Sequence, residues 1–193
     1  MFVRSSISLL KSTSQCKIIP IVESRVQFTQ VFDSPQINSI LLRHCNLFDL
    51  TNLLNEAHKR AFSVFVNIDH IDGIHADFAG LRYLAESLHV TGIISNHPRI
   101  LSLGKDYGLE TIQRIFAVDS TGLEMALESV DTLYVDLLDI SPGLVTTYIA
   151  AHTMAQLPLP FIASGLIHTP QQVRAVLQSG AVGVAVSRPE LWL

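Results

Sequence analysis

The chain has 193 residues, enough for one domain with a sizeable hydrophobic core. Hydrophobic residues make up 48% of it and charged residues only 16%, against about 25% in an ordinary globular domain. The formal net charge of -4 excludes attraction of the whole chain to nucleic acid or an anionic membrane, and no apolar run reaches the roughly 18 residues that a membrane span needs. The apolar surplus leaves open a surface that is covered by self-association, as in a homo-oligomer.

The two cysteines, Cys16 and Cys45, offer no disulfide framework, so a reducing, cytoplasmic compartment is expected. The first 22 residues contain no acidic residue and are rich in serine, a composition also found in organellar transit peptides. We favour the simpler interpretation, a loose N-terminal arm over residues 1–17. The remaining residues, 18–193, are then expected to form one domain.

From Ile18 onward, short apolar runs rich in β-branched residues alternate with helix-like segments. Because these runs are continuous rather than alternating with polar residues, they predict strands that are buried on both faces. Eight such strands are predicted, beginning near Ile18 (IIPIV), Ser39 (SILLRHC), Ser63 (SVFVNID), Thr91 (TGIIS), Glu110 (ETIQRIF), Thr132 (TLYVDLL), Pro160 (PFIAS) and Ala181 (AVGVAVS).

Capping residues predict where the intervening helices begin and end. Thr169 and Gln172 form a capping box around Pro170, and Gly180 fits the left-handed stop of the same helix. The other predicted signals are Thr121 with Glu124 as a second capping box, Asp77 as a cap, Pro98 as a start and Gly108 as a stop. Amphipathic or apolar helices are also predicted over Leu50 to Arg60 and Leu144 to Met154.

Strands that alternate with helices predict a parallel α/β fold, and two architectures are compatible with the pattern. An open, doubly wound sheet fits the alternation. A closed (β/α)8 TIM-type barrel, forming a single domain, uses every unit and leaves no edge strand. Eight units without a domain break favour the barrel. The chain is short for this fold, which typically takes about 250 residues, so the first and last helices should be minimal.

A parallel barrel carries its site at the C-terminal ends of the strands. Polar residues lie in or just after six of the predicted strands: Asn67 and Asp69 in the third, Ser95 and Asn96 in the fourth, Gln113 and Arg114 in the fifth, Asp136 and Asp139 in the sixth, Ser164 and Gly165 in the seventh, and Ser187 and Arg188 in the eighth. These side chains are the candidates for a binding site at one end of the barrel.

The turn at Ser164 and Gly165 has two interpretations. Gly165 could simply allow a tight connection, or its backbone N–H groups could hold a phosphate together with those after the eighth strand. Asp69 and Asp136 could recognise hydroxyl groups, act as acid and base, or form structural ion pairs with Arg114.

Several kinds of chemistry find no support in the sequence. The four lysines do not end strands, so Schiff-base catalysis lacks a nucleophile. The cluster DHIDGIHAD at residues 69–77 does not have the spacing of a compact zinc motif. Basic residues are scattered and are not interleaved with aromatic residues, so RNA binding has little direct support.

The ordered segments IIPIV, VNIDHIDGI, TGIIS, TIQRIFAVDSTGLE and ASGLIHTPQQV…SGAVGVAVSRPELW resemble the glycerol-3-phosphate-responsive antiterminator family of bacterial glycerol uptake regulators. The resemblance runs from about Lys17 to Trp192. It implies a small (β/α)8 barrel that binds glycerol 3-phosphate and acts on leader mRNA to relieve transcription termination.

The resemblance also implies roles for individual residues. Matching positions are Asp69, Gln113, Arg114, Gly165, Leu166 and Ser187. The chain departs from the family pattern at several positions. Asn67 replaces a histidine, and Ser164 replaces a glycine. Glu23 and Ser24 replace an Arg-Asn pair, for which Arg25 could compensate. His168 stands in place of an arginine, Ala185 and Val186 in place of two threonines, and Asp136 lies farther from Pro142 and Gly143 than the family's glutamate does.

Together these observations predict a non-enzymatic regulator without a cofactor that binds glycerol 3-phosphate or a related phosphorylated polyol and leader mRNA. The phosphate would be held by Ser164, Gly165, Leu166, Ser187 and Arg188, and the hydroxyls by Asn67, Asp69, Asp136 and Gln113, with Arg114 orienting the carboxylates. Two alternatives stay open: a phosphate-ligand barrel enzyme that uses Asp69 and Asp136 as acid and base, and a diverged sensor that no longer binds RNA.

Overall fold

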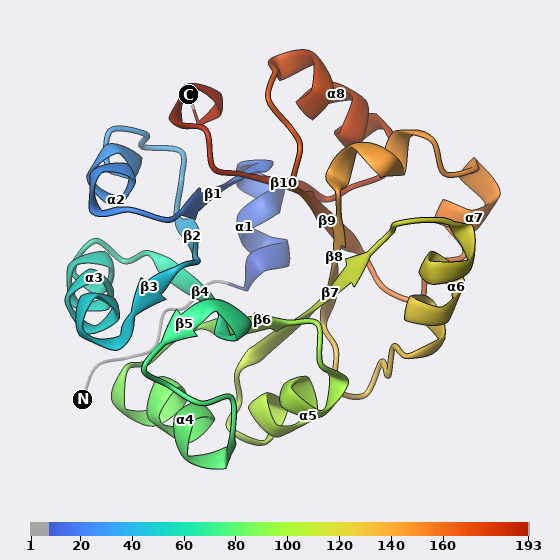
Figure 1. The fold of residues 1–193 in the computed structure, drawn as a ribbon. Helices are drawn as coiled ribbons and strands as arrows, with labels where there is room; N and C mark the ends of the chain where they lie inside the picture. The colour runs from blue at the N-terminus through green and yellow to red at the C-terminus, as the bar shows by residue number, and fades with distance from the viewer. Residues whose placement is uncertain (1–7, 193) are drawn as a thin grey trace.

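The structure is a computed structural model in which residues 8–192 are described. Its centre is a closed barrel of parallel strands in the order β1-β10-β9-β8-β7-β6-β4-β2, with helices around it (Figure 1). The strands are β1 (Ile18–Val22), β2 (Ser39–Leu42), β4 (Ser63–Asn67), β6 (Gly92–Ser95), β7 (Glu110–Phe116), β8 (Leu137–Ser141), β9 (Phe161–Ser164) and β10 (Gly183–Val186). The predicted closed (β/α)8 barrel is therefore confirmed, and the open sheet is wrong.

The outer layer consists of helices of unequal length. They are α2 (Arg25–Val31), α3 (Leu47–Lys59), α4 (Phe78–Arg82), which continues as the π-helical turn η2 (Tyr83–Ser87), α5 (Pro98–Asp106), α6 (Ser120–Glu128), α7 (Ala151–Ala155) and α8 (Pro170–Gln178). Short 3-10 turns complete the chain: η1 (Ile68–His70), η3 (Gly143–Thr147) and η4 (Pro189–Leu191), and β3 (Cys45–Asn46) pairs with β5 (Ile71–Asp72) outside the barrel. None of the helices described in residues 8–192 is long and apolar enough to cross a membrane.

Several helix boundaries follow the sequence signals, and two differ. The capping box at Thr169 and Gln172 and the Asp77 cap are present as predicted. Asp119, rather than Thr121, caps α6, because its carboxylate already accepts the N–H of Gly122 at 2.7 Å and the helix starts earlier. The helix predicted over Leu144 to Met154 is broken into η3 and α7.

The sixth strand begins five residues later than predicted. The carboxylate of Asp131 accepts the N–H of Leu133 at 2.9 Å, and its carbonyl accepts the N–H of Tyr134 at 3.0 Å. This local turn competes with strand pairing, as aspartate turns commonly do. The strand then starts at Leu137, so Asp136 comes before it and Asp139 lies within it.

The interior of the barrel is filled by one apolar layer. It consists of Ile19, Ile21, Leu41, Phe65, Ile94, Ile112, Leu137, Ile162 and Ala185 from the strands, together with Leu9 from helix α1 (Leu9–Gln15). Burial of a leucine of this kind contributes about 1.5–3 kcal/mol. A second, larger cluster lies between the strands and the surrounding helices.

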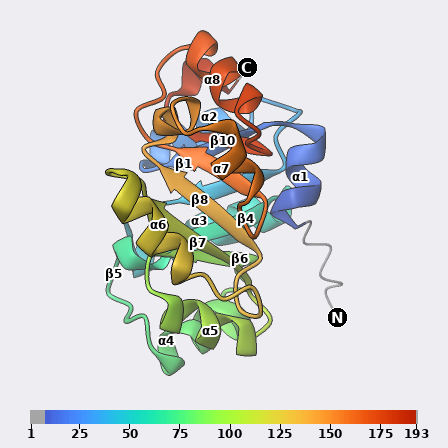
Figure 2. The same ribbon diagram turned by 90° about the vertical axis from the view of Figure 1, so that its right-hand side faces the viewer.

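Helix α1 covers the N-terminal end of the barrel and lies on the side opposite β5 (Figure 2). The backbone N–H of Leu9 donates to both carboxylate oxygens of Glu110, at 3.0 and 3.1 Å. Ser12 contacts Ser39 at 2.7 Å. The loose arm predicted for residues 1–17 is therefore wrong for residues 8–17. Residues 1–7, over which the transit-peptide alternative also extended, lie outside the described part of the chain.

Candidate ligand-binding mouth

The C-terminal ends of the strands form a polar mouth above the apolar layer. Side chains of a strand alternate between its two faces, so residues two positions beyond the interior layer also point into the barrel. We use the word mouth for the side chains at these positions: Glu23, Arg43, Asn67, Asn96, Arg114, Asp139, Ser164 and Ser187. Ser164 is 1% exposed. It is paired with Ala185 on β10, and Ser187 follows two residues after Ala185 on the same face.

A buried ion pair spans two neighbouring strands of the mouth. Arg114 on β7 lies opposite Asp139 on β8, and its Nε donates to Asp139 Oδ2 at 2.8 Å. The Nη2 atom lies 2.7 Å from the same oxygen, and the two side chains are 5% and 0% exposed. A charge buried this deeply is costly unless a partner of opposite charge is present. Removing either residue would therefore leave the other as an uncompensated buried charge.

Two buried acceptors in the mouth, Asn67 Oδ1 and Asp139 Oδ1, have no hydrogen-bond partner among the described residues. The Arg114 Nη2 atom contacts only Asp139 Oδ2, the oxygen that its Nε already binds. Leaving such groups unpaired costs about 1–3 kcal/mol each, more for charged groups. A ligand with hydroxyl groups would supply the missing donors, so the mouth is built for a polar molecule.

Asp69 is also placed at the rim, but its carboxylate is already used. It accepts the hydroxyl of Ser95 at 2.8 Å and the backbone N–H of Asn96 at 3.0 Å. These bonds fix the carboxylate between the ends of β4 and β6, and the side chain remains exposed to solvent. Asp69 can thus accept a further hydroxyl from a ligand at the rim.

The loop after β9 has the backbone shape expected of an anion site. Gly165 and Leu166 both adopt positive φ angles, +84° and +58°. Their N–H groups have no acceptor within residues 8–192, while the Gly165 carbonyl accepts the N–H of Gly143 at 3.1 Å. Arg188, after β10, donates from Nε to His168 Nδ1 at 2.9 Å, which holds the cation beside this loop.

Two predicted site residues lie elsewhere. Asp136 is at the opposite end of the barrel, where it pairs with Lys105 and accepts the N–H of Thr111 at 2.9 Å. Its placement corrects the prediction, because the sixth strand starts after it. Gln113 lies next to inward-facing Ile112 and Arg114, so it points outward and donates to Ser129 at 2.9 Å. Its match to a family position therefore does not place it in the mouth.

The sequence interpretation also missed part of the mouth. Glu23 at the end of β1 pairs with Arg43 at the end of β2, with Arg43 Nε 2.7 Å from Glu23 Oε1. This pair lies across the barrel from Arg114 and Asp139, because β1 and β2 are opposite β7 and β8 in the strand order. Arg25, which could have compensated for Glu23, instead pairs with Glu56 on α3. The alternation of side chains along SILLRHC was the signal that could have identified Arg43.

Two histidines lie beside this second ion pair. The rings of His44 and His70 stack with centroids 4.7 Å apart. Burial lowers the pKa of His70, and the neighbouring His44, Arg114 and Arg43 lower it further. An anionic ligand in the mouth would oppose this effect and favour the protonated ring.

The structure gives little basis for metal or thiolate chemistry. Burial, together with Asp49 and Asp72, raises the pKa of Cys45 to about 11, so its thiol stays protonated. Cys45 lines a hollow of about 180 Å³ beside Glu23. Within residues 8–192, no three side chains of the metal-binding types are placed to share an ion. A larger hollow of about 390 Å³ lies outside the barrel rather than at the mouth.

Comparison with known proteins identifies the family. A family model described as "Glycerol-3-phosphate responsive antiterminator" matches residues 18–192. The chain belongs to this family. The resemblance seen in the sequence is thereby confirmed. In a search of curated proteins, none matches the chain.

Solved structures of similar proteins share the fold. A glycerol uptake operon antiterminator regulatory protein from Listeria monocytogenes has a TM-score of 0.84 at 24% identity, covering 92% of this chain and 95% of that one. A related protein from Thermotoga maritima has a TM-score of 0.78 at 24% identity, covering 91% and 96%. A deoxyribose phosphate aldolase from Aeropyrum pernix reaches 0.68 at 18% identity, covering 95% and 89%.

The observed start of the sixth strand bears on one departure from the family pattern. The resemblance implies a glutamate followed closely by Pro-Gly after this strand, and Asp136 lies farther from Pro142 than that. Asp139 lies three residues before Pro142 and Gly143 and points into the mouth. Asp139 therefore has the close spacing to Pro142 that the resemblance implies, and Asp136 does not.

Proposed function

We propose that the protein is a non-enzymatic regulator that binds glycerol 3-phosphate in the barrel mouth and thereby controls its action on leader mRNA. The N–H groups of Gly165 and Leu166 would hold the phosphate, with Ser164, Ser187 and Arg188 beside them. Asn67, Asp139 and Arg114 would receive the glycerol hydroxyls, and Asp69 would do so at the rim.

The unpaired buried atoms of the mouth carry this proposal. Asn67 Oδ1 and Asp139 Oδ1 require donors that the described residues do not provide. Glycerol 3-phosphate offers two hydroxyl donors at one end and a phosphate at the other. A ligand of this kind would satisfy the buried acceptors and the free amides of the Gly165 loop together.

Geometry supports a regulator over the enzyme alternative. Asp69 and Asp136 lie at opposite ends of the barrel, so they cannot act as acid and base on one substrate. The lysines are equally remote: Lys11 lies on α1 and Lys17 before β1, while Lys59 and Lys105 lie in the last turns of their helices. Schiff-base chemistry of the aldolase kind would need an amine in the mouth.

Thermal unfolding with and without glycerol 3-phosphate tests the ligand assignment. A ligand that binds only the folded state at 100 times its Kd adds about 2.7 kcal/mol, so a clear rise in Tm is expected. Glycerol and inorganic phosphate, added separately, should each give a smaller rise. No change in Tm at millimolar glycerol 3-phosphate would contradict the proposal.

A glycine pair provides the matched control. A Cβ at Gly165, where φ is +84°, would lie 3.1 Å from Ser141 Oγ, whereas one at Gly108, where φ is +70°, would meet no atom within 4 Å. Both Gly165→Ala and Gly108→Ala should lower the free energy of unfolding by about 1–2 kcal/mol, the backbone cost of a side chain at positive φ, and should therefore lower Tm. Only Gly165→Ala should also reduce the rise in Tm caused by ligand. An equal ligand response in both variants would remove the Gly165 loop from the site.

A further inference from the structure

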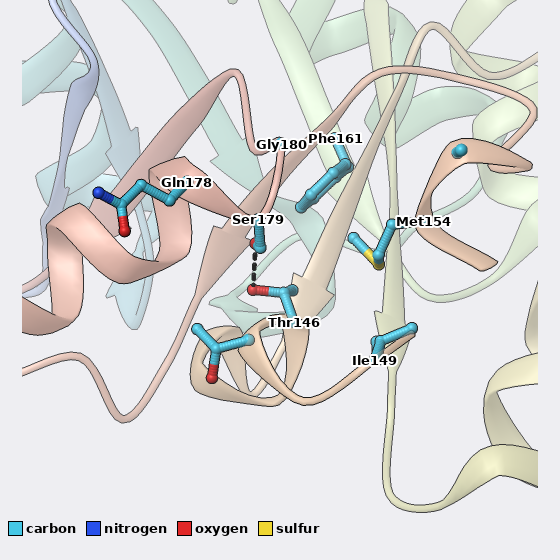
Figure 3. A pocket seen from close by; sticks show the side chains of 9 residues that line it. Thr146, Ile149, Met154, Phe161, Gln178, Ser179 and Gly180 are labelled. Carbon is cyan, nitrogen blue, oxygen red and sulfur yellow. Dashed lines mark hydrogen bonds between the residues drawn. The ribbon is translucent and has the colours of Figure 1, made fainter. Parts of the chain in front are cut away.

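The hollow of about 390 Å³ lies outside the barrel. Turn η3 and helix α7 line one side of it, and the end of α8 and the start of β9 line the other (Figure 3). Its lining includes Thr146, Ile149, Met154, Phe161 and Ser179. The hollow is open to solvent, so the segment that lines it is left unpacked on this side.

The first residue of η3 is held by the loop that would bind phosphate. The N–H of Gly143 donates to the Gly165 carbonyl at 3.1 Å. A Cβ at Gly143 would lie 2.7 Å from Ile167 Cδ1 and 3.1 Å from the backbone nitrogen of Ser164. A larger residue would have to push these atoms apart, so Gly143 keeps η3 in direct contact with the Gly165 loop.

A buried threonine continues the connection to the hollow. Thr146, which is 1% exposed, donates from Oγ1 to the Gly143 carbonyl at 2.8 Å. Ser179 Oγ, at the end of α8, lies 2.9 Å from Thr146 Oγ1 and also 2.7 Å from the Val176 carbonyl (Figure 3). Hydrogen bonds thus run from the Gly165 loop through Thr146 to the helix that lines the hollow.

Helix α7, at the other end of the segment, is weakly held. It has five residues and no side-chain cap, and none of its side chains described in the structure is fully buried. Tyr148, between η3 and α7, is 88% exposed. Few buried contacts and an uncapped short helix are the marks of a segment with a low cost of local opening.

We propose that residues 143–155, comprising η3 and α7, are the element that changes position when the mouth is occupied. This inference rests on the proposed function, since it names the regulated element of the same site. Phosphate bound at the Gly165 and Leu166 amides fixes the orientation of the Gly165 peptide, and Gly143 transmits it to η3. The segment then has two arrangements. In one of them α7 enters the hollow, and Tyr148 moves with it. Ligand then selects the arrangement in which it binds more tightly.

Hydrogen exchange measured on the full chain, with and without saturating glycerol 3-phosphate, tests the inference. We expect exchange in residues 144–157 to change by at least about fivefold, the lower end of usual coupling between sites. The helix of residues 47–59, across the barrel, should not change. A change confined to the loops at residues 67–70, 114, 139 and 164–168 would overturn the inference and leave the ligand assignment intact. Absence of any ligand-induced change in exchange or Tm would overturn both.

Thr146→Val removes the buried hydroxyl without a large change in shape, and Thr147→Val is its control. Thr147 is exposed and donates only to the Leu144 carbonyl, at 2.8 Å. Thr146→Val should keep the ligand-induced rise in Tm and lose the exchange response of residues 144–157, whereas Thr147→Val should keep both. Ser179→Ala breaks the same connection from α8 and should behave as Thr146→Val does. A full response in both Thr146→Val and Ser179→Ala would overturn the inference.

Discussion

Two aspartates three residues apart show how strongly position decides the role of a side chain. Asp139 is fully buried and has its ion-pair partner, Arg114, in the mouth. Asp136 is about one-third exposed and pairs with Lys105 at the other end of the barrel. An exposed ion pair contributes about 0–1 kcal/mol, whereas breaking a buried one costs about 3–5 kcal/mol. The two carboxylates should therefore respond very differently to the same substitution.

We expect Asp139→Asn to lower the free energy of unfolding by about 3–5 kcal/mol, because Arg114 then remains buried without a counter-charge. It should also abolish the ligand-induced rise in Tm. Asp136→Asn should cost about 1 kcal/mol or less and leave the ligand response unchanged. Urea denaturation and thermal unfolding with glycerol 3-phosphate measure the two effects. Equal ligand responses in both variants would contradict the assignment of Asp139 to the site.

The sequence could identify most of the mouth but not which way each side chain points. Arg114, Ser164, Gly165 and Ser187 could be predicted because they lie near or just after the ends of strands with clear apolar runs. Gln113 was misplaced because a shift of one residue exchanges the two faces of a strand, and no residue in QRIF marks the inner face. Asp136 was misplaced because its strand begins only at Leu137. The unpaired atoms of Asn67 and Asp139 are visible only when the neighbouring strands are in place.

At the scale of elements, the strands were easier to predict than the helix that closes the barrel. Continuous apolar runs identify buried strands without any knowledge of their partners. Helix α1 has only Leu9, Ser12 and Thr13 buried, too few apolar residues to show a helical period. Its partners are the barrel interior and Glu110, which lies 101 residues away in the chain. Such a contact depends on the closed barrel and cannot be read from local sequence.

The contact between α1 and Glu110 predicts a pH dependence of stability. The pKa of Glu110 is raised to about 7, chiefly by burial and in part by Asp136, while the Leu9 N–H and Lys105 act in the opposite direction. A glutamate in the unfolded chain has a pKa of about 4.3. Between these values the folded state holds a proton that the unfolded chain has lost, so the free energy of unfolding falls as pH rises and levels off above pH 7.

Glu110→Gln removes this titration while leaving an oxygen to accept the Leu9 N–H. We expect the variant to lose less stability than the original chain between about pH 4.5 and 7.5, as measured by urea denaturation across that range. All other titratable groups are the same in both proteins, so the difference between the two curves reports Glu110. Parallel curves would show that the carboxyl group at α1 does not set the pH dependence.

At the scale of the whole molecule, the closed barrel separates structural roles from the proposed binding role. The N-terminal end is covered by α1 and holds ion pairs such as Lys105 with Asp136. The C-terminal end carries the unpaired polar atoms and the free amides. Large apolar side chains, including Val118, Met125 and Tyr148, remain exposed around the barrel, and self-association over such a surface remains a prediction.

The net charge of -4 constrains how such a regulator could bind RNA. Long-range attraction by the whole molecule is absent, so affinity would have to come from local contacts made in one arrangement of the chain. If glycerol 3-phosphate favours that arrangement, the two ligands are coupled. Coupling between binding sites is reciprocal: RNA must strengthen glycerol 3-phosphate binding by the same factor by which glycerol 3-phosphate strengthens RNA binding.

We therefore expect a leader transcript to lower the Kd for glycerol 3-phosphate by about 5- to 150-fold, the usual range of such coupling, with an equal effect in the other direction. Calorimetric titration of each ligand, with and without the other, measures both factors. RNA affinity should also fall with rising salt, with a slope that counts the phosphates contacted. A transcript of scrambled sequence is the control. Normal glycerol 3-phosphate binding without any transcript binding would instead support a sensor that no longer acts on RNA.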